Sequence, residues 1–86
     1  MASYRIEVSS TAEKQIGKLG RDNQIQVLRA IQRLATQPRP PGCRKLQGYD
    51  DVFRIRIGTY RVLYGVESRR LLVLVLKIGQ RKDIYR

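Results

Sequence analysis

The sequence predicts a single α+β domain in which a helical hairpin covers one face of a small, mostly antiparallel sheet, in the order βααβββ. Three observations favour this fold. Apolar residues recur at helical spacing in the first half of the chain, strand-like apolar runs fill the second half, and the chain has only 86 residues. A chain of this length forms one modest core, and its apolar content of 42% is typical of a folded protein. We therefore assign residues 1–86 to one domain.

The first two elements are expected to be a strand and a helix. Residues 4–8 alternate between apolar and polar side chains, which predicts a short, half-buried strand at or near the edge of the sheet. Ser10 and Glu13 fit an S-x-x-E capping box, in which each side chain satisfies a backbone N–H of the other residue. The helix that begins there is expected to run to about Leu19, because Gly20 is a natural helix stop.

A second helix follows, with Asp22 as its expected cap. It should end near Thr36, because the prolines of QPRPPG at residues 37–42 cannot continue a helix. Residues at helical spacing form its expected apolar face, namely Ile25, Leu28, Ile31, Leu34 and Ala35. The two helices form a hairpin that needs a sheet to cover it, and we assign no chemistry to either helix.

The remaining sequence predicts a sheet. Residues 44–46 are expected to pair briefly. Residues 52–57 and 60–67 predict two strands joined at residues 58–59, where a glycine in first place suits a type II′ turn. Residues 71–78 are almost continuously apolar, as in a strand buried on both faces. We expect that strand to be central, with the helices against one face.

Composition narrows the possible chemistry. The chain contains no histidine, which rules out a Ser-His-Asp triad, the common histidine-containing metal sites and the paired-histidine mechanism of many ribonucleases. Cys43 is the only cysteine, so the chain forms no internal disulfide and no thiolate cluster. We expect no cofactor and no metal. Any catalysis must be carried by Arg, Lys, Tyr or the carboxylates.

The charge of the chain predicts a polyanionic ligand. The formal net charge is +11, and +8 of it lies from residue 39 onward, where arginines and tyrosines interleave with strand-like apolar residues. Neutralised phosphates release counterions and strengthen binding, which favours RNA as the ligand. No signal peptide is apparent, and the longest apolar run falls far below the roughly 20 residues that span a bilayer. We expect a cytoplasmic protein with no membrane partner.

The predicted hairpin places three arginines on one face of the sheet. With the turn at residues 58–59, Arg56 lies opposite Arg61, and Arg54 shares their face. Like charges directly across a strand pair destabilise a fold by up to about 1 kcal/mol. A bound phosphate reverses this penalty, because guanidinium groups form bidentate hydrogen bonds to it. We favour an anion site over the alternative, a solvated face with splayed side chains.

A basic tail follows the last predicted strand. A tyrosine beside cationic residues can stack on an unpaired RNA base, worth about 1–3 kcal/mol per base. The alternative for Tyr85 is packing against the sheet edge, and the residues alone favour this alternative. The tail also holds Arg81, Lys82 and Arg86. The residues that we predict to bind RNA are Arg54, Lys77, Lys82 and Arg86.

Several segments occur in an order and spacing that are together fairly specific. After the strand and the helical hairpin come K-L-Q-G at residues 45–48, F-R-I-R-I, Y-R-V-L-Y and finally I-G-Q-R-K-D-I-Y. Over nearly its whole length, the chain resembles the RelE/ParE superfamily of bacterial toxin-antitoxin toxins. The RelE branch fits better, because the basic positions of its active face are filled. The resemblance implies a metal-independent endoribonuclease that cuts the mRNA codon in the ribosomal A site and arrests translation.

The resemblance also implies roles for individual residues. In the family, the ribose 2′-OH attacks the adjacent phosphate and a 5′-OH leaves. Arg54 and Arg56 match a basic pair, and Arg61 matches the phosphate-binding arginine. Arg81 matches the residue proposed to protonate the leaving oxygen, but an arginine pKa above about 12 makes charge stabilisation the safer role. Tyr85 matches the tyrosine that stacks on the base. The catalytic residues predicted in this way are Arg56, Arg61, Arg81 and Tyr85.

Two departures from the family pattern leave the general base unassigned. Relatives often carry lysine at the position of Arg56 and histidine at the position of Gln80. Arginine resists deprotonation and is a poor base. Catalysis would then rest on electrostatics and on positioning of the mRNA by the ribosome.

The resemblance implies three partners. One is a cognate antitoxin with an acidic or amphipathic segment that wraps the domain and blocks its arginines, in a hetero-oligomeric complex that binds DNA through the antitoxin. The others are the 30S A site of the ribosome and mRNA. Two alternatives stay open: a ParE-like toxin that poisons DNA gyrase without nuclease activity, and an inactive RNA-binding module that keeps only the phosphate clamp.

Overall fold

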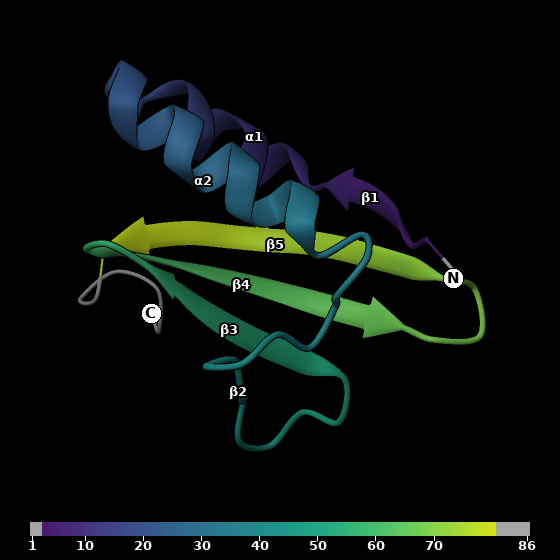
Figure 1. Ribbon diagram of the computed structural model, residues 1–86. Helices are drawn as coiled ribbons and strands as arrows, with labels where there is room; N and C mark the ends of the chain where they lie inside the picture. Colours follow the sequence, from purple (N-terminus) through teal and green to yellow (C-terminus); the bar gives the residue numbers. More distant parts are fainter. Residues whose placement is uncertain (1–2, 81–86) are drawn as a thin grey trace.

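A computed structural model of the protein describes residues 3–80 and places two helices on one face of a five-stranded sheet (Figure 1). The elements are β1 (Arg5–Val8), α1 (Ser10–Gly17), α2 (Arg21–Arg33), β2 (Arg44–Lys45), β3 (Val52–Ile57), β4 (Tyr60–Glu67) and β5 (Leu72–Gln80). The strand order is β1-β5-β4-β3-β2, with β1 parallel to β5 and every other pair antiparallel. The predicted α+β class is confirmed, and the brief pairing expected at residues 44–46 is the short strand β2.

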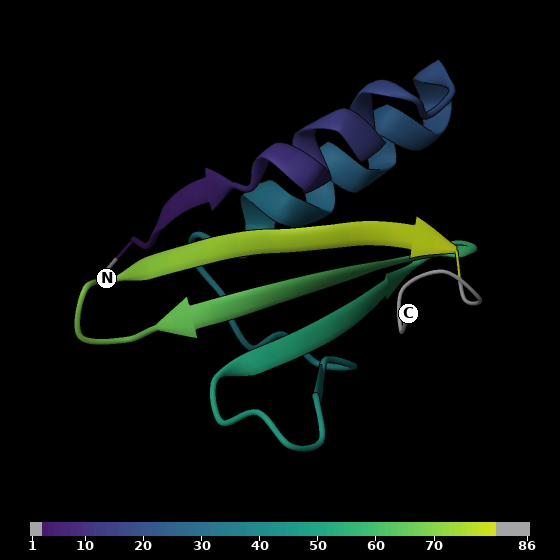
Figure 2. The same ribbon diagram turned by 180° about the vertical axis from the view of Figure 1, so that it is seen from behind.

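The view from behind shows that both helices lie on the same side of the sheet, so no helix of the described chain covers the opposite face (Figure 2). The core fills the space between the helices and the sheet. Its largest fully buried members come from α2, the turn after it, β4 and β5: Val27, Leu34, Val62, Tyr64, Val66, Val73, Val75 and Ile78. No helix within residues 3–80 is long and apolar enough to cross a membrane. The uncovered face of the sheet is therefore the place to look for a ligand site.

Both helices begin earlier than the sequence pattern indicates. Ser9, not Ser10, caps α1, and its Oγ accepts a hydrogen bond from the backbone N–H of Ala12. The cap shifts by one residue because the Ser9 N–H is already held by Val75 O at the end of the β1–β5 pairing. Gly20, not Asp22, is the N-cap of α2, and it makes no side-chain capping bond. Asp22 lies in the first turn of α2, where a carboxylate is favoured by the helix dipole.

The predicted apolar face of α2 is partly wrong. Ile31 and Leu34 are buried as expected, but Ile25 and Leu28 are each 40% exposed, and Val27 is fully buried instead. The reason is geometric. Steps of three residues drift by about 60° around a helix at each step, so residues 25, 28 and 31 do not share one face. The buried stripe follows the steps of four and three from residue 27 to 31 to 34.

The hairpin of β3 and β4 has the predicted register. Ile57 pairs with Tyr60, and Arg56 pairs with Arg61. Gly58 has a φ of 60°, while Thr59 is not among the residues with positive φ, which fits a type II′ turn and not a type I′ turn. The register that brings the arginines together is therefore set by a glycine in a conformation that other residues adopt with difficulty.

The last strand differs from its prediction in three ways. It begins at Leu72, because Leu71 lies in the preceding turn with a φ of 49°, and it extends to Gln80, two residues past the predicted end. It is an interior strand between β1 and β4, but the middle strand of the five is β4. Helix α1 packs against β5 and α2 against β3, so the hairpin spans the sheet as expected.

A β-bulge divides β5. Val75 pairs with Tyr64, but the next residue of β4, Leu63, pairs with Lys77, so Leu76 is an extra residue without a partner in β4. Val75 and Ile78 are consequently both buried although they are three residues apart. Lys77 pairs with Leu63 and therefore lies in the same row as Arg54, on the uncovered face.

Candidate functional site

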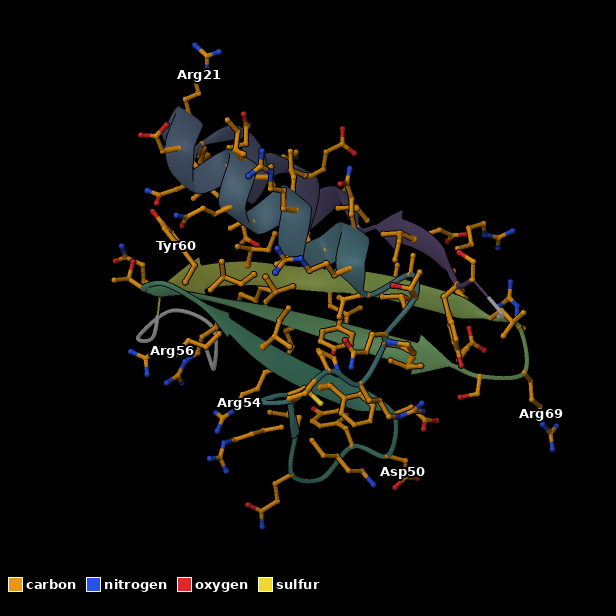
Figure 3. All side chains as sticks on the ribbon, in the orientation of Figure 1. Arg21, Asp50, Arg54, Arg56, Tyr60 and Arg69 are labelled. Atoms are coloured by element: carbon orange, nitrogen blue, oxygen red, sulfur yellow. The ribbon has the colours of Figure 1, made fainter. Side chains whose placement is uncertain are left out.

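The uncovered face of the sheet carries a cluster of five cations, which we call the arginine face: Arg44, Arg54, Arg56, Arg61 and Lys77. Strand pairing places them in two rows. Lys77, Leu63, Arg54 and Arg44 lie side by side across four strands, and Gly79, Arg61 and Arg56 form the neighbouring row. In Figure 3, Arg54 and Arg56 extend from β3 away from the helices, whereas Tyr60 points toward them.

Two arginine pairs face each other directly across neighbouring strands. Arg56 lies opposite Arg61, as predicted, and Arg44 lies opposite Arg54. Together with Gly42 and Ile55, these four arginines line a concave site of about 470 Å³. Two such pairs destabilise the folded sheet without a counterion, each by up to about 1 kcal/mol. The arrangement therefore favours an anion that bridges the guanidinium groups.

The guanidinium of Arg56 is turned toward its own hairpin. Its Nε–H donates a hydrogen bond of 3.3 Å to the carbonyl oxygen of Gly58. This contact draws the charge of Arg56 toward the end of the hairpin and eases its repulsion with Arg61. Arg56 is exposed, whereas Arg54, Arg61 and Lys77 are each partly buried. Arg56 and Arg44 are thus the two members of the arginine face that are exposed to solvent.

Of the eight predicted site residues, the structure brings four together: Arg54, Arg56, Arg61 and Lys77. The other four, Arg81, Lys82, Tyr85 and Arg86, lie outside the described residues, so their predicted roles stay predictions. Arg44 was not predicted. Its signal was weak, because the six residues between β2 and β3 leave the register of a two-residue strand open. Only the observed pairing with Arg54 assigns Arg44 to the arginine face.

A second basic concavity adjoins the first. A groove of about 690 Å³ lies between α2, the loop at residues 37–42 and the β3–β4 turn. Arg29, Arg33 and Arg56 line it, over a floor that includes Leu34 and Ile55. We call it the α2–β3 groove. Among the residues that the structure describes, no carboxylate lines it.

The sequence did not assign Arg29 or Arg33 any chemistry. Their four-residue spacing on α2 was a usable signal, because it places both side chains on one side of a helix. The α2–β3 groove and the concave site both include Gly42, Ile55 and Arg56. Basic surface therefore continues around the edge of β3, from the helices to the arginine face.

The loop that walls the α2–β3 groove is held by a buried tyrosine. The hydroxyl of Tyr64 donates a hydrogen bond of 2.8 Å to the carbonyl oxygen of Pro38, and the Tyr64 side chain is fully buried. Arg39, the next residue, stacks its guanidinium over the ring of Phe53 at 5.3 Å. Burial, with a smaller contribution from the nearby Cys43, raises the pKa of Tyr64 well above its usual value near 10.

Replacing Tyr64 by phenylalanine is expected to change how stability depends on pH. At neutral pH the variant should lose about 1–2 kcal/mol, because the Pro38 carbonyl loses its donor. The raised pKa favours the protonated phenol in the folded state. The stability that Tyr64 contributes is therefore complete below pH 10 and declines above it, by about 1.4 kcal/mol per pH unit, as the unfolded chain ionises.

Urea unfolding of both proteins between pH 7 and pH 11 measures this difference. The two curves of unfolding free energy against pH should converge above pH 10. The other tyrosines do not affect this comparison, because they contribute equally to both curves. Parallel curves over the whole range would contradict the role of burial at Tyr64.

Comparisons with known proteins agree with this geometry. A family model described as the ParE toxin of a type II toxin-antitoxin system, parDE, matches residues 6–85. Toxin RelG of Mycobacterium tuberculosis is 30% identical over 84 residues, which cover 96% of this chain and 97% of RelG. The residues matched by the family model include the positions of every member of the arginine face.

Two solved structures share the fold. The toxin-antitoxin complex RelBE2 from Mycobacterium tuberculosis aligns with a TM-score of 0.83 at 26% identity, covering 96% of this chain and 97% of that one. The archaeal RelE-RelB complex from Pyrococcus horikoshii aligns with a TM-score of 0.83 at 27% identity, covering 94% of this chain and 98% of that one. Both contain a toxin together with its antitoxin.

Proposed function

We propose that this chain, which belongs to the RelE/ParE superfamily of toxins from type II toxin-antitoxin systems, is an endoribonuclease that cuts mRNA in the ribosomal A site. The arginine face supports the proposal. Four arginines from three strands line one concave site, in two cross-strand pairs that folding alone disfavours. A phosphodiester is the ligand whose charge and geometry suit such a site.

The proposed reaction is an internal transesterification. The ribose 2′ oxygen forms a bond to the adjacent phosphorus, and the bond from phosphorus to the 5′ oxygen of the next nucleotide breaks. One proton leaves the 2′-OH and one is taken up by the 5′ oxygen, so the products are a 2′,3′-cyclic phosphate and a 5′-OH. Negative charge builds up on the phosphoryl oxygens in the transition state. We assign its stabilisation to Arg61, with Arg54 and Arg56 beside it.

We assign no general base to the chain. The sequence has no histidine, and arginine is a poor proton acceptor at neutral pH. The rate acceleration would come mainly from charge stabilisation and from alignment of the 2′-OH with the phosphate by the ribosome. Arg81 and Tyr85 keep their proposed roles at the leaving oxygen and on the base.

A cell-free translation reaction tests the proposal. Added protein should cut the mRNA at the codon in the A site, and the 3′ fragment should carry a 5′-OH. The same mRNA without ribosomes should stay intact. Arrest of translation with full-length mRNA would contradict the proposal, and salt-dependent RNA binding without any cutting would identify an inactive RNA-binding module.

The description of the matching family model favours one competing function. That model is described as a ParE toxin. The competing function is therefore that of a ParE-like toxin, which would poison DNA gyrase and have no nuclease activity. A supercoiling and DNA-cleavage assay with purified gyrase separates the two. The proposed ribonuclease leaves gyrase activity unchanged, whereas a gyrase poison traps cleaved DNA and spares the mRNA.

The chain has a cognate antitoxin partner, as the toxins of the complexes with RelB do. We propose that the antitoxin places an acidic amphipathic segment in the α2–β3 groove. The apolar floor suits apolar side chains of a protein, and Arg29, Arg33 and Arg56 suit its carboxylates. Because Arg56 also lines the concave site of the arginine face, a segment in this groove would cover part of the proposed catalytic surface.

A further inference from the structure

The second half of β5 lacks a strand neighbour on one side. Strand β1 pairs with β5 only from Leu72 to Val75, and the chain then turns into α1. Beyond Val75, the edge of β5 that faced β1 would expose backbone groups with no partner strand. Lys77 lies in this part of β5, and the bulge at Leu76 precedes it directly.

Two side chains, one from the N-cap of α1 and one from within α1, replace the missing strand. The Oγ of Ser9 donates a hydrogen bond of 2.8 Å to the carbonyl oxygen of Leu76, the bulged residue. The Oε1 of Gln15 accepts a hydrogen bond of 2.7 Å from the backbone N–H of Ile78. Both contacts are partly buried and join residues more than 60 positions apart in the sequence. Ser9 and Gln15 thus hold the backbone on either side of Lys77.

The bulge determines the face to which Lys77 points. If the pairing continued regularly from Val75, Lys77 would lie opposite Val62, which is fully buried under the helices. With Leu76 as the extra residue, Lys77 lies opposite Leu63 and shares a row with Arg54, while Ile78 takes the buried position opposite Val62. The orientation of this amine therefore depends on a local irregularity of the backbone.

We propose that Ser9 and Gln15 are positioning residues that fix the β-bulge at Leu76 and so present the Lys77 amine on the arginine face to an RNA phosphate. This inference rests on the proposed function, because it assumes an RNA ligand. Neither side chain touches the RNA. They act through the backbone of β5. Their hydrogen bonds hold the backbone on which the binding group, the Lys77 amine, is carried.

The test compares variants that release the bulge with variants that keep it. Ser9→Gly removes the hydroxyl donor, and glycine is a tolerable helix N-cap, so α1 loses only a few tenths of a kcal/mol. Gln15→Met removes the acceptor at nearly constant shape and charge. Ser9→Thr keeps a hydroxyl that both caps α1 and reaches Leu76, and it is the conservative control. Lys77→Met removes the charge itself.

Two measurements are made on each protein. Amide hydrogen exchange reports whether the backbone at Ile78 is held. Binding of a short single-stranded RNA over a range of salt concentrations reports phosphate contacts, because each one contributes about 0.7 to the slope of log affinity against log salt. Both measurements are repeated with Lys77→Met added to each background.

In the wild-type and Ser9→Thr backgrounds, Lys77→Met should lower the salt slope by about 0.7. In the Ser9→Gly/Gln15→Met background, exchange at Ile78 should accelerate while Val73 stays protected, and Lys77→Met should lower the slope by less than half as much. An equal effect of Lys77→Met in both backgrounds would overturn the proposal, as would no effect in the wild type. Unchanged exchange at Ile78 would overturn it too.

Failure of the proposed function gives a different result. In that case the wild-type protein would not cut mRNA, whatever the exchange data show. If it still bound RNA with a salt-dependent affinity, the effect of Lys77→Met on the salt slope would decide the inference as before. If it did not bind RNA, the claim that Lys77 meets an RNA phosphate would be rejected, and the exchange data would still decide whether Ser9 and Gln15 hold the bulge.

Discussion

Replacing Arg61 by alanine is expected to lower the rate of mRNA cleavage in a cell-free translation reaction by about 10²–10³-fold, the usual cost of losing one preorganised group that stabilises transition-state charge. Arg61 lies on the central strand β4, between Arg56 on β3 and Gly79 on β5. A guanidinium held on a central strand is already oriented when the phosphate arrives. Its loss should therefore lower the cleavage rate more than it weakens binding of the ribosome.

The stability of the variant separates chemistry from folding. Because Arg61 lies opposite Arg56, removing it should change the free energy of unfolding by no more than about 1 kcal/mol. Urea unfolding checks this expectation. Arg61→Lys should cut faster than Arg61→Ala but slower than the wild type, because lysine keeps the charge and loses the bidentate fork.

Arg69→Ala is the matched control. Arg69 is exposed in the turn between β4 and β5, at the other end of the sheet from Arg56 (Figure 3). The substitution Arg69→Ala removes the same charge and leaves the arginine face unchanged, so cleavage should stay close to the wild-type rate. A similar loss of cutting in Arg61→Ala and Arg69→Ala would assign the effect to net charge and would reject Arg61 as a catalytic residue.

The arginine pair on β3 and β4 was predictable because its register depends on local sequence alone. A two-residue turn fixes the pairing of both strands, and Gly58 marks that turn. Once the turn is known, alternation of side chains assigns each arginine to a face. This part of the candidate site needs no tertiary information.

Arg44 and the orientation of Lys77 were not predictable in the same way. The loop between β2 and β3 can place Arg44 opposite any of several residues, and the observed partner depends on packing. Lys77 was predicted to bind RNA, but its run of apolar neighbours indicated a strand buried on both faces. The bulge that places Lys77 on the uncovered face is bonded by Ser9 and Gln15, which are more than 60 residues away in the sequence. No local sequence pattern predicts this bulge.

The helices illustrate a different limit. Their existence followed from periodicity, yet the buried face of α2 was placed wrongly at Ile25 and Leu28. Because residues three apart drift by about 60° around a helix at each step, a run of such spacings predicts a helix without identifying its buried face. The spacing of Arg29 and Arg33 places them on one side of α2, but only the observed orientation of α2 shows that this side lines the α2–β3 groove.

Reversing the charges of Arg29 and Arg33 is expected to weaken antitoxin binding. In the double variant Arg29→Glu/Arg33→Glu, an acidic segment in the α2–β3 groove would lose two attractive contacts and meet two repulsive ones. We expect the dissociation constant to rise roughly 10- to 100-fold, and its salt dependence to become smaller. Isothermal titration with the purified cognate antitoxin at several salt concentrations measures both. Circular dichroism checks that the variant keeps its fold, since both arginines are exposed.

The control for this experiment must carry the same change in net charge. Arg21→Glu/Arg69→Glu provides it, because both residues are exposed and neither lines the groove (Figure 3). A long-range effect of the overall positive field would weaken binding equally in both double variants, and that result would reject the groove as the antitoxin site. A loss confined to Arg29→Glu/Arg33→Glu would instead support the groove as the antitoxin site. Because Arg56 lines both the groove and the concave site, an antitoxin segment bound there would also cover the edge of the proposed catalytic surface.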